Sequence, residues 1–299
     1  MVVNEIHNQE EQVRCARAVS QAKQGQWMRW EGLEKRKMSW ADLWAMESSR
    51  ISFLIRSVYD VLPTPKNLNQ WLGEDPCCSL CGSSATLRHI LVACKVSLSQ
   101  QRYTWRHNII LQSLAAAIDI KRNESNTKPV KGKEYSITFV REGQKLPNRG
   151  TNIPLGTLQK ANDWVLLVDL IHRLVIPAEL ATSNLRPDII FCSTALHKVF
   201  IIELTVPWED SIFEAYERKK SKYTELAAEM ESNGWHTDIC PIEVTARGFV
   251  ARSTVNLLRK LGLVGQELRR ITKELSAKAE HSSRFLWYRR NDKKWANYE

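Results

Sequence analysis

Two acidic residues stand where ionised carboxylates are unfavourable unless they bind a cation. Asp188 opens one short apolar run, and Glu203 lies inside a second run at residues 201–206. A carboxylate among apolar side chains is costly unless it is paired or coordinates a metal. The short segment 193–197 between the two apolar, β-branched runs predicts a β-hairpin that brings both carboxylates together. Such a pair suits Mg²⁺ or Mn²⁺, which also bind phosphate; a buried salt bridge to Arg186 or another cation is the alternative.

One lysine lies on the apolar face of an expected helix. Residues 211–231 predict a single helix, and at about 100° per residue Lys219 falls in the middle of its apolar face. Lys220 and Lys222 fall on the two shoulders of that face. A lysine in this position either extends past the core to water or points at an anionic site. Because two carboxylates and a phosphate need neutralising, we expect Lys219 to position an attacking water or to stabilise charge on the phosphate.

Four potential metal ligands follow the compact spacing C-x2-C-x7-H-x4-C. They are Cys78, Cys81, His89 and Cys94. Two thiolates separated by two residues chelate one ion from a tight turn, which Gly82 permits. His89 and Cys94 are about one helical turn apart, so both can face the ion. Four ligands complete a tetrahedron with no open position, which predicts a structural zinc ion. The alternative is a set of unrelated buried cysteines with a core histidine.

The elements that position these residues fall into a helical first part and a second part with strands. Apolar residues recur at steps of three and four before Pro63, and we expect the tryptophans among them in the core; these include Trp27, Trp30, Trp40 and Trp44. Residues 105–120 predict a helix, 239–246 a strand and 253–278 one or two helices, whereas 164–170 fit either a strand or a helix.

The sequence therefore predicts a mixed α+β fold in which a helical, zinc-binding N-terminal region precedes an α/β domain. Its regions are a helical Trp-rich part at 1–74, the zinc segment with the following helix at 75–120, a basic linker at 121–160, the α/β domain at 161–280 and a basic aromatic tail at 281–299.

Composition restricts the class of partner. The formal net charge of +10 favours a polyanion such as nucleic acid, because neutralising phosphates releases counterions; a basic, solvated surface is the alternative. Seven cysteines, an odd number spread unevenly, do not indicate a disulfide framework. No signal peptide opens the sequence and no apolar run suits a bilayer, so we expect a soluble, intracellular protein without a membrane partner.

The ordered motifs resemble a known protein family. Pro187-Asp188 followed by Glu203-x-Thr205 resembles the PD-(D/E)xK nuclease motif, with Thr205 in place of the usual last lysine and the basic residue displaced to Lys219. Together with the preceding Cys/Cys/His/Cys motif, the stretch from about Trp27 to Trp287 resembles the C-terminal region of site-specific non-LTR retrotransposon reverse transcriptases. That region carries a CCHC zinc motif and a restriction-like endonuclease.

The resemblance implies a restriction-endonuclease-like domain that nicks target DNA in the nucleus. It implies that Asp188 and Glu203 bind Mg²⁺ or Mn²⁺, that Lys219 is the catalytic lysine, and that Lys222 and Tyr223 support the site. DNA is the expected partner and RNA of the element a further candidate; the oligomeric state stays undetermined. The sequence departs from these elements in having no Asp-Asp pair and hence no polymerase signature. We expect a fragment, a decayed copy or a standalone product.

Two other functions compete with the endonuclease. The positive charge, the zinc segment and the missing polymerase also fit a catalytically inactive or domesticated protein, which would bind nucleic acid in a salt-sensitive way. An ordinary α/β protein would use Glu203 and Lys219 as a buried ion pair, and removing Glu203 would then cost about 3–5 kcal/mol of stability.

Overall fold

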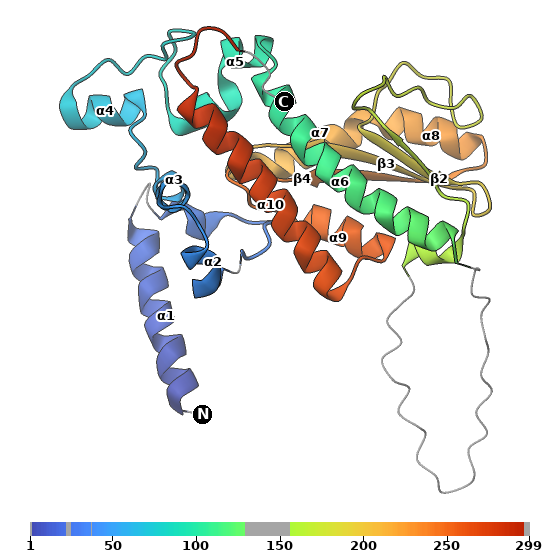
Figure 1. Ribbon diagram of the computed structural model, residues 1–299, viewed down its shortest axis with the longest axis horizontal. Coiled ribbons are helices and arrows are strands. Elements are labelled where there is room, and N and C mark those ends of the chain that lie inside the picture. Colours follow the sequence, from blue (N-terminus) through green and yellow to red (C-terminus); the bar gives the residue numbers. More distant parts are fainter. Residues whose placement is uncertain (1, 22–24, 37, 129–155, 296–299) are drawn as a thin grey trace, which may run out of the picture.

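A mixed sheet organises the described part of the chain. The computed structural model describes residues 2–21, 25–36, 38–128 and 156–295. Within these ranges the strands form one four-stranded sheet with helices on both faces (Figure 1). The strand order is β1-β2-β3-β4, with bounds of Val165–Val168, Ile189–Ser193, Lys198–Thr205 and His236–Glu243. This arrangement confirms the predicted mixed fold class.

The predicted hairpin forms from β2 and β3. These strands are antiparallel, with Ile189 opposite Ile202. One further step along the same register sets Asp188 against Glu203, at the end of the hairpin away from its turn. β1 extends the antiparallel ladder beside β2, so the ambiguous run at 164–170 contains a strand. Strand pairing therefore brings the two acidic residues together as expected.

The chain then crosses over through helices to reach β4, which runs parallel to β3. The crossover contains η4 (Glu209–Ser211), α7 (Ile212–Lys222) and α8 (Thr224–Ser232). The expected single helix over 211–231 is therefore wrong, because it is interrupted at Tyr223, where φ is −104° and ψ is 7°. Tyr223 is fully buried and its hydroxyl contacts Glu203 of β3 and the Arg186 carbonyl, so tertiary contacts outweigh the local preference for a continuous helix.

Alternate side chains of the strands enter two separate cores. Phe191 and Phe200 face one side, where Trp164 stacks on Phe191 with ring centroids 4.8 Å apart. The helices on that side are α6 (Arg102–Asn126), α9 (Arg252–Leu261) and α10 (Gly265–Tyr288). Ile190 and Ile201 face the other side and pack with apolar residues of α8. Burial on both faces explains why β2 and the centre of β3 lack polar alternation.

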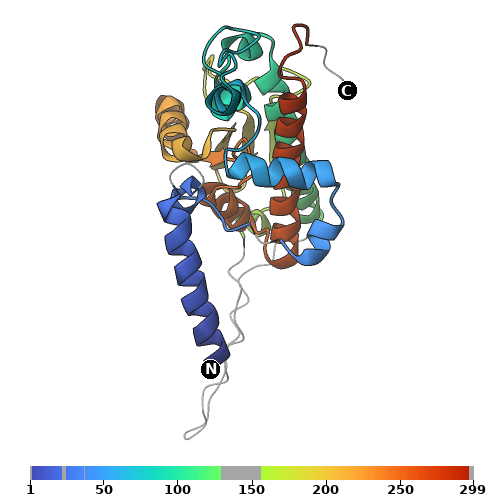
Figure 2. The ribbon, with the colours of Figure 1, turned by 90° about the vertical axis from the view of Figure 1, so that its left-hand side faces the viewer.

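The N-terminal part is helical, as predicted. Its elements are α1 (Val2–Ser20), η1 (Gln26–Arg29), α2 (Trp40–Trp44), α3 (Ser48–Val58) and α4 (Pro65–Leu72). α1 has no buried residue and extends away from the remainder (Figures 1 and 2). The expectation that the tryptophans are core is wrong for Trp40 and Trp44, which are 77% and 85% exposed. Their helix has five residues and buries none of them, so it has no inward face for these rings.

Two buried carboxylates fasten this helical part to the sheet region. Glu280 of α10 accepts hydrogen bonds from Arg36 at 2.6 Å and from Arg50 at 2.6 Å. Glu209 pairs with Arg247 at 2.5 Å, and that guanidinium lies between the rings of two tryptophans, 4.2 Å and 3.9 Å from their centroids. The tryptophans are Trp30 and Trp208. Charge and aromatic stacking therefore join segments that are far apart in sequence.

Helix α6 spans two of the regions predicted from the sequence and packs against the strands of a third. α6 begins in the predicted zinc segment, yet its Ile110 and Leu114 share a core with the strands. The same helix continues into the predicted linker as far as Asn126, and η3 (Thr157–Lys160) follows the gap. The rest of the linker, residues 129–155, lies outside the described residues. Among the helices that are described, none has the length and apolar character needed to cross a membrane.

Candidate active site and metal cluster

The end of the β2–β3 hairpin holds the two predicted carboxylates in reciprocal contact. The Asp188 amide donates to Glu203 Oε2 at 3.1 Å, and the Leu204 amide donates to Asp188 Oδ2 at 2.7 Å. The Asp188 side chain is 15% exposed, whereas that of Glu203 is 4% exposed. Each strand thus fixes the acid of its neighbour, and Asp188 is the one that solvent reaches.

The predicted basic residues surround Glu203. Lys219 Nζ lies 2.5 Å from Glu203 Oε1, and Lys222 Nζ lies 3.7 Å from the same oxygen. The Tyr223 hydroxyl is 2.8 Å from Oε2 and 2.9 Å from the Arg186 carbonyl. Burial, reinforced by the nearby negative charge of Glu203, raises the pKa of Tyr223 well above its usual range, so the phenol stays protonated. The carboxylate of Glu203 is therefore compensated on both oxygens.

Arg186 has a different partner from the one that the sequence suggests. Its guanidinium binds both oxygens of Asp169, at 2.7 Å and 2.8 Å. The Asp169 amide in turn donates to the Asp188 carbonyl at 2.9 Å. The cation that pairs with Glu203 is Lys219, so the geometry of a buried ion pair and that of a catalytic lysine coincide here.

A histidine that the sequence analysis missed completes the group. His107 of α6 places Nε2 3.1 Å from Asp188 Oδ2 and 3.3 Å from the Leu204 carbonyl oxygen. Its other ring nitrogen lies 3.2 Å from Asn108 Oδ1. Burial alone would lower the pKa of His107, but the hydrogen bond and charge of Asp188 outweigh burial and raise it. The signal in the sequence was a histidine one turn before Leu111 on the buried face of the predicted helix.

Thr205 occupies the place of the missing motif lysine and does not reach the carboxylates by any hydrogen bond. Its buried Oγ1 has no hydrogen-bond partner within the described ranges. Across the sheet it is paired with Glu243, which is fully buried and whose Oε1 also lacks a partner there. Burial raises the pKa of Glu243 to about 7, against an opposing hydrogen bond from Ser253. The position next to the acidic pair is thus polar, enclosed and uncharged at mildly acidic pH.

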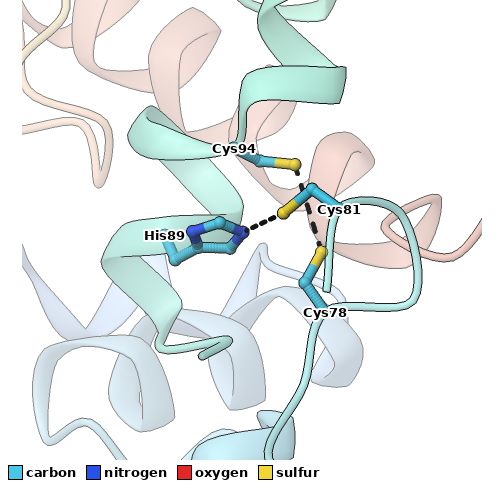
Figure 3. Close-up of side chains that lie close together, drawn as sticks. All are labelled: Cys78, Cys81, His89 and Cys94. Carbon is cyan, nitrogen blue, oxygen red and sulfur yellow. Dashed lines mark hydrogen bonds between the residues drawn. The ribbon is translucent and has the colours of Figure 1, made fainter. Parts of the chain in front are cut away.

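The four predicted zinc ligands meet in a second place, against the end of α10. One ligand atom from each of Cys78, Cys81, His89 and Cys94 lies within 4.8 Å of all the others (Figure 3). The closest pair is Cys81 Sγ and His89 Nε2, at 3.2 Å, while Cys78 Sγ and Cys94 Sγ are 4.0 Å apart. The cluster could therefore hold a metal ion.

Local backbone geometry assembles this cluster. Gly82 adopts a φ of 73° directly after the Cys78–Cys81 turn, a conformation that favours glycine. η2 (His89–Ala93) is a π-helix, and its i→i+5 pattern brings His89 over Cys94, five residues later. Burial lowers the pKa of His89, which favours the neutral imidazole that a metal needs. The Cys94 amide donates to the Tyr103 hydroxyl at 3.0 Å, which ties the cluster to α6.

Comparison with known proteins identifies no family for this chain, so any function must be argued from the contacts described above. No protein-family model matches the chain, and no curated protein matches it at a significant level.

Proposed function

We propose that the chain is a metal-dependent DNA endonuclease domain of the kind found in site-specific non-LTR retrotransposon proteins. The observation that carries the proposal is the meeting of Asp188, Glu203 and Lys219 at one end of a hairpin, from three elements that follow one another along the chain. A strand pair with two acids, followed by a helix that supplies a lysine, is the arrangement expected of a restriction-like nuclease. The reaction would be hydrolysis of one phosphodiester bond, which leaves a nick.

The donor set fits a divalent cation at Asp188. Asp188 Oδ2 and the Leu204 carbonyl oxygen lie close together, since both are near His107 Nε2, at 3.1 Å and 3.3 Å. Carboxylate and carbonyl oxygens are the ligands that Mg²⁺ and Mn²⁺ prefer. Asp188 and Glu203 would hold the ion, which when bound would bind a phosphate oxygen and lower the pKa of a coordinated water.

Lys219 and Lys222 would contact the phosphate group of the bound DNA. The Lys219 side chain is 22% exposed and that of Lys222 is 42% exposed, so both ammonium groups can reach a bound backbone. Lys219 would donate to a phosphate oxygen as negative charge develops, while Glu203 fixes its position. Tyr223 would keep the Glu203 carboxylate in place through its hydroxyl. These roles need Lys219 to share its protons between Glu203 and the substrate.

We further propose that the Cys/His cluster holds a structural Zn²⁺. Three thiolates and one imidazole fill a tetrahedral shell with no position left for substrate. Because Cys78 and Cys94 pack with residues of α10, the ion would fasten η2 to that helix. The net charge of +10 supports a DNA partner, with element RNA as a further candidate, and a nuclear location would follow from that role.

One observation favours the second candidate, a nucleic-acid-binding protein without catalysis. Lys219 and Tyr223 already compensate Glu203, which is what a purely structural ion pair needs. In that case DNA binding would depend on salt but not on Asp188.

Nicking of supercoiled plasmid by the zinc-loaded protein with Mg²⁺ or Mn²⁺ separates the two candidates. We expect Asp188→Asn to lower the nicking rate at least about 100-fold, because metal stabilisation of the transition state amounts to several kcal/mol. Asp238→Asn is the matched control, since this acid binds Lys198 and Lys260 elsewhere on the sheet. Wild-type protein that binds DNA but nicks no faster than Asp188→Asn would refute the endonuclease and leave the binding protein.

A further inference from the structure

His107 Nε2 lies where a metal ligand would have to lie. In an octahedral site with bonds of about 2.1 Å, neighbouring ligand atoms are roughly 3.0 Å apart. The two oxygens nearest to Nε2, Asp188 Oδ2 and the Leu204 carbonyl, are 3.1 Å and 3.3 Å from it. The edges of this triangle that involve Nε2 thus match the spacing of metal ligands without movement of the backbone.

The second ring nitrogen is held in the manner of a metal-binding imidazole. His107 Nδ1 lies 3.2 Å from Asn108 Oδ1, so its N–H can donate to the side-chain amide oxygen. Both neighbours of Nε2, the Asp188 carboxylate and the Leu204 carbonyl, are acceptors, so Nε2 donates its own proton toward them here. A cation that binds between them would replace that proton, while Nδ1 keeps its contact with Asn108. The neighbouring residue on α6 therefore orients the ring for coordination.

Exposure to solvent also distinguishes His107 from Glu203, the second acidic residue of the site. Glu203 is 4% exposed and is occupied by Lys219, Tyr223 and the Asp188 amide. The side chains of His107 and Asp188 are 24% and 15% exposed, so a hydrated ion can reach them from solvent. Glu203 would need to give up at least one of these contacts to bind the ion, whereas His107 needs to lose only a hydrogen bond that the ion replaces.

We propose that His107 is a nitrogen ligand of the divalent cation at Asp188, together with the Leu204 carbonyl, and that this site prefers Mn²⁺ to Mg²⁺. Imidazole nitrogen suits transition-metal ions, whereas Mg²⁺ takes oxygen ligands almost exclusively. The inference rests on the proposed cation site but does not require that the bound ion support nicking.

Pulsed electron paramagnetic resonance of bound Mn²⁺ tests the ligand directly. With zinc in the Cys/His cluster, we expect a ¹⁴N coupling from a coordinated imidazole that becomes a ¹⁵N coupling in protein labelled with ¹⁵N-histidine. His107→Gln should remove the coupling and weaken Mn²⁺ binding by about 10- to 100-fold. His281→Gln, at an exposed position of α10, is the matched control and should change neither. The wild-type spectrum decides the question even if His107→Gln folds poorly.

The outcomes separate this inference from the proposed function. Bound Mn²⁺ without nitrogen coupling, or Mg²⁺ binding as tight as that of Mn²⁺, would overturn the inference, and Mn²⁺-dependent nicking under those conditions would still support the endonuclease. A nitrogen coupling that depends on His107, in a protein that nicks no DNA, would support the inference and refute the endonuclease.

Discussion

Replacing Glu243 by glutamine should stabilise the protein, and increasingly so as the pH rises. Glu243 is fully buried at the end of β4, with one oxygen bonded by Ser253 and the other without a partner in the described part of the chain. Its paired residue on β3, Thr205, has a hydroxyl that likewise finds no hydrogen-bond partner among the described residues. Burial disfavours an ionised carboxylate at this position and raises the pKa of Glu243 to about 7 from a usual 4.5.

The sign and size of the effect follow from proton linkage. Between pH 4.5 and 7 the folded chain keeps a proton on Glu243 that the unfolded chain has lost, so wild-type stability falls as the pH rises. One pKa unit corresponds to about 1.4 kcal/mol, so the penalty is about 1 kcal/mol at pH 5.5 and about 3 kcal/mol at pH 8. The Glu243→Gln amide has nearly the same shape and no charge at either pH, so it should recover most of this penalty.

Urea unfolding of the zinc-loaded protein at pH 5.5 and pH 8 measures the difference. We expect the gain from Glu243→Gln to grow by about 2 kcal/mol between the two pH values. Glu214→Gln, at an exposed position of α7, controls for general effects of removing one negative charge. An equal gain at both pH values, or a variant less stable than wild type at pH 8, would show that Glu243 has a counter-charge and that its burial does not govern its ionisation.

Three further changes test other parts of the structure. Glu280→Ala should cost about 2–3 kcal/mol in urea unfolding, because it removes the buried carboxylate that accepts charge-assisted hydrogen bonds from two partly exposed arginines; a cost below 1 kcal/mol, as for a surface pair, would contradict this. Cys81→Ser should lower bound zinc measured by mass spectrometry from near one equivalent to a small fraction and lower the melting temperature, whereas Cys77→Ser, just outside the cluster, should change neither. Without divalent cations, Glu203→Ala should lower stability by about 3–5 kcal/mol if the contact with Lys219 acts as an ion pair; an unchanged or raised melting temperature would indicate relief of repulsion between the two acids.

The features that the sequence predicted well depend on short-range rules. The Cys/His spacing needs only a tight turn and a helical turn, and the structure supplies a glycine at φ of 73° and a π-helix. The meeting of Asp188 and Glu203 needs only a hairpin of the right register. In both cases the residues that converge are separated by a single local element.

The features that the sequence missed depend on packing between distant segments. His107 lies 81 residues before Asp188, and no local pattern states that α6 crosses that end of the hairpin. The break at Tyr223 is equally non-local, because a buried hydroxyl bound to Glu203 outweighs the helix preference of the surrounding residues. The exposed Trp40 belongs to a helix whose surroundings, rather than its composition, decide burial.

α6 connects the two sites that the sequence analysis treated as separate. Tyr103 on its first turn accepts a hydrogen bond from the Cys94 amide, and its hydroxyl lies 2.9 Å from the Ile90 carbonyl. His107 follows four residues later, so it lies on the same face of the helix one turn further on. An ion in the cluster would therefore fix the start of α6, and with it the position of the His107 ring relative to the Asp188 carboxylate. If the cluster binds a metal, that ion and the acidic site would both depend on the position of α6, although they share no ligand.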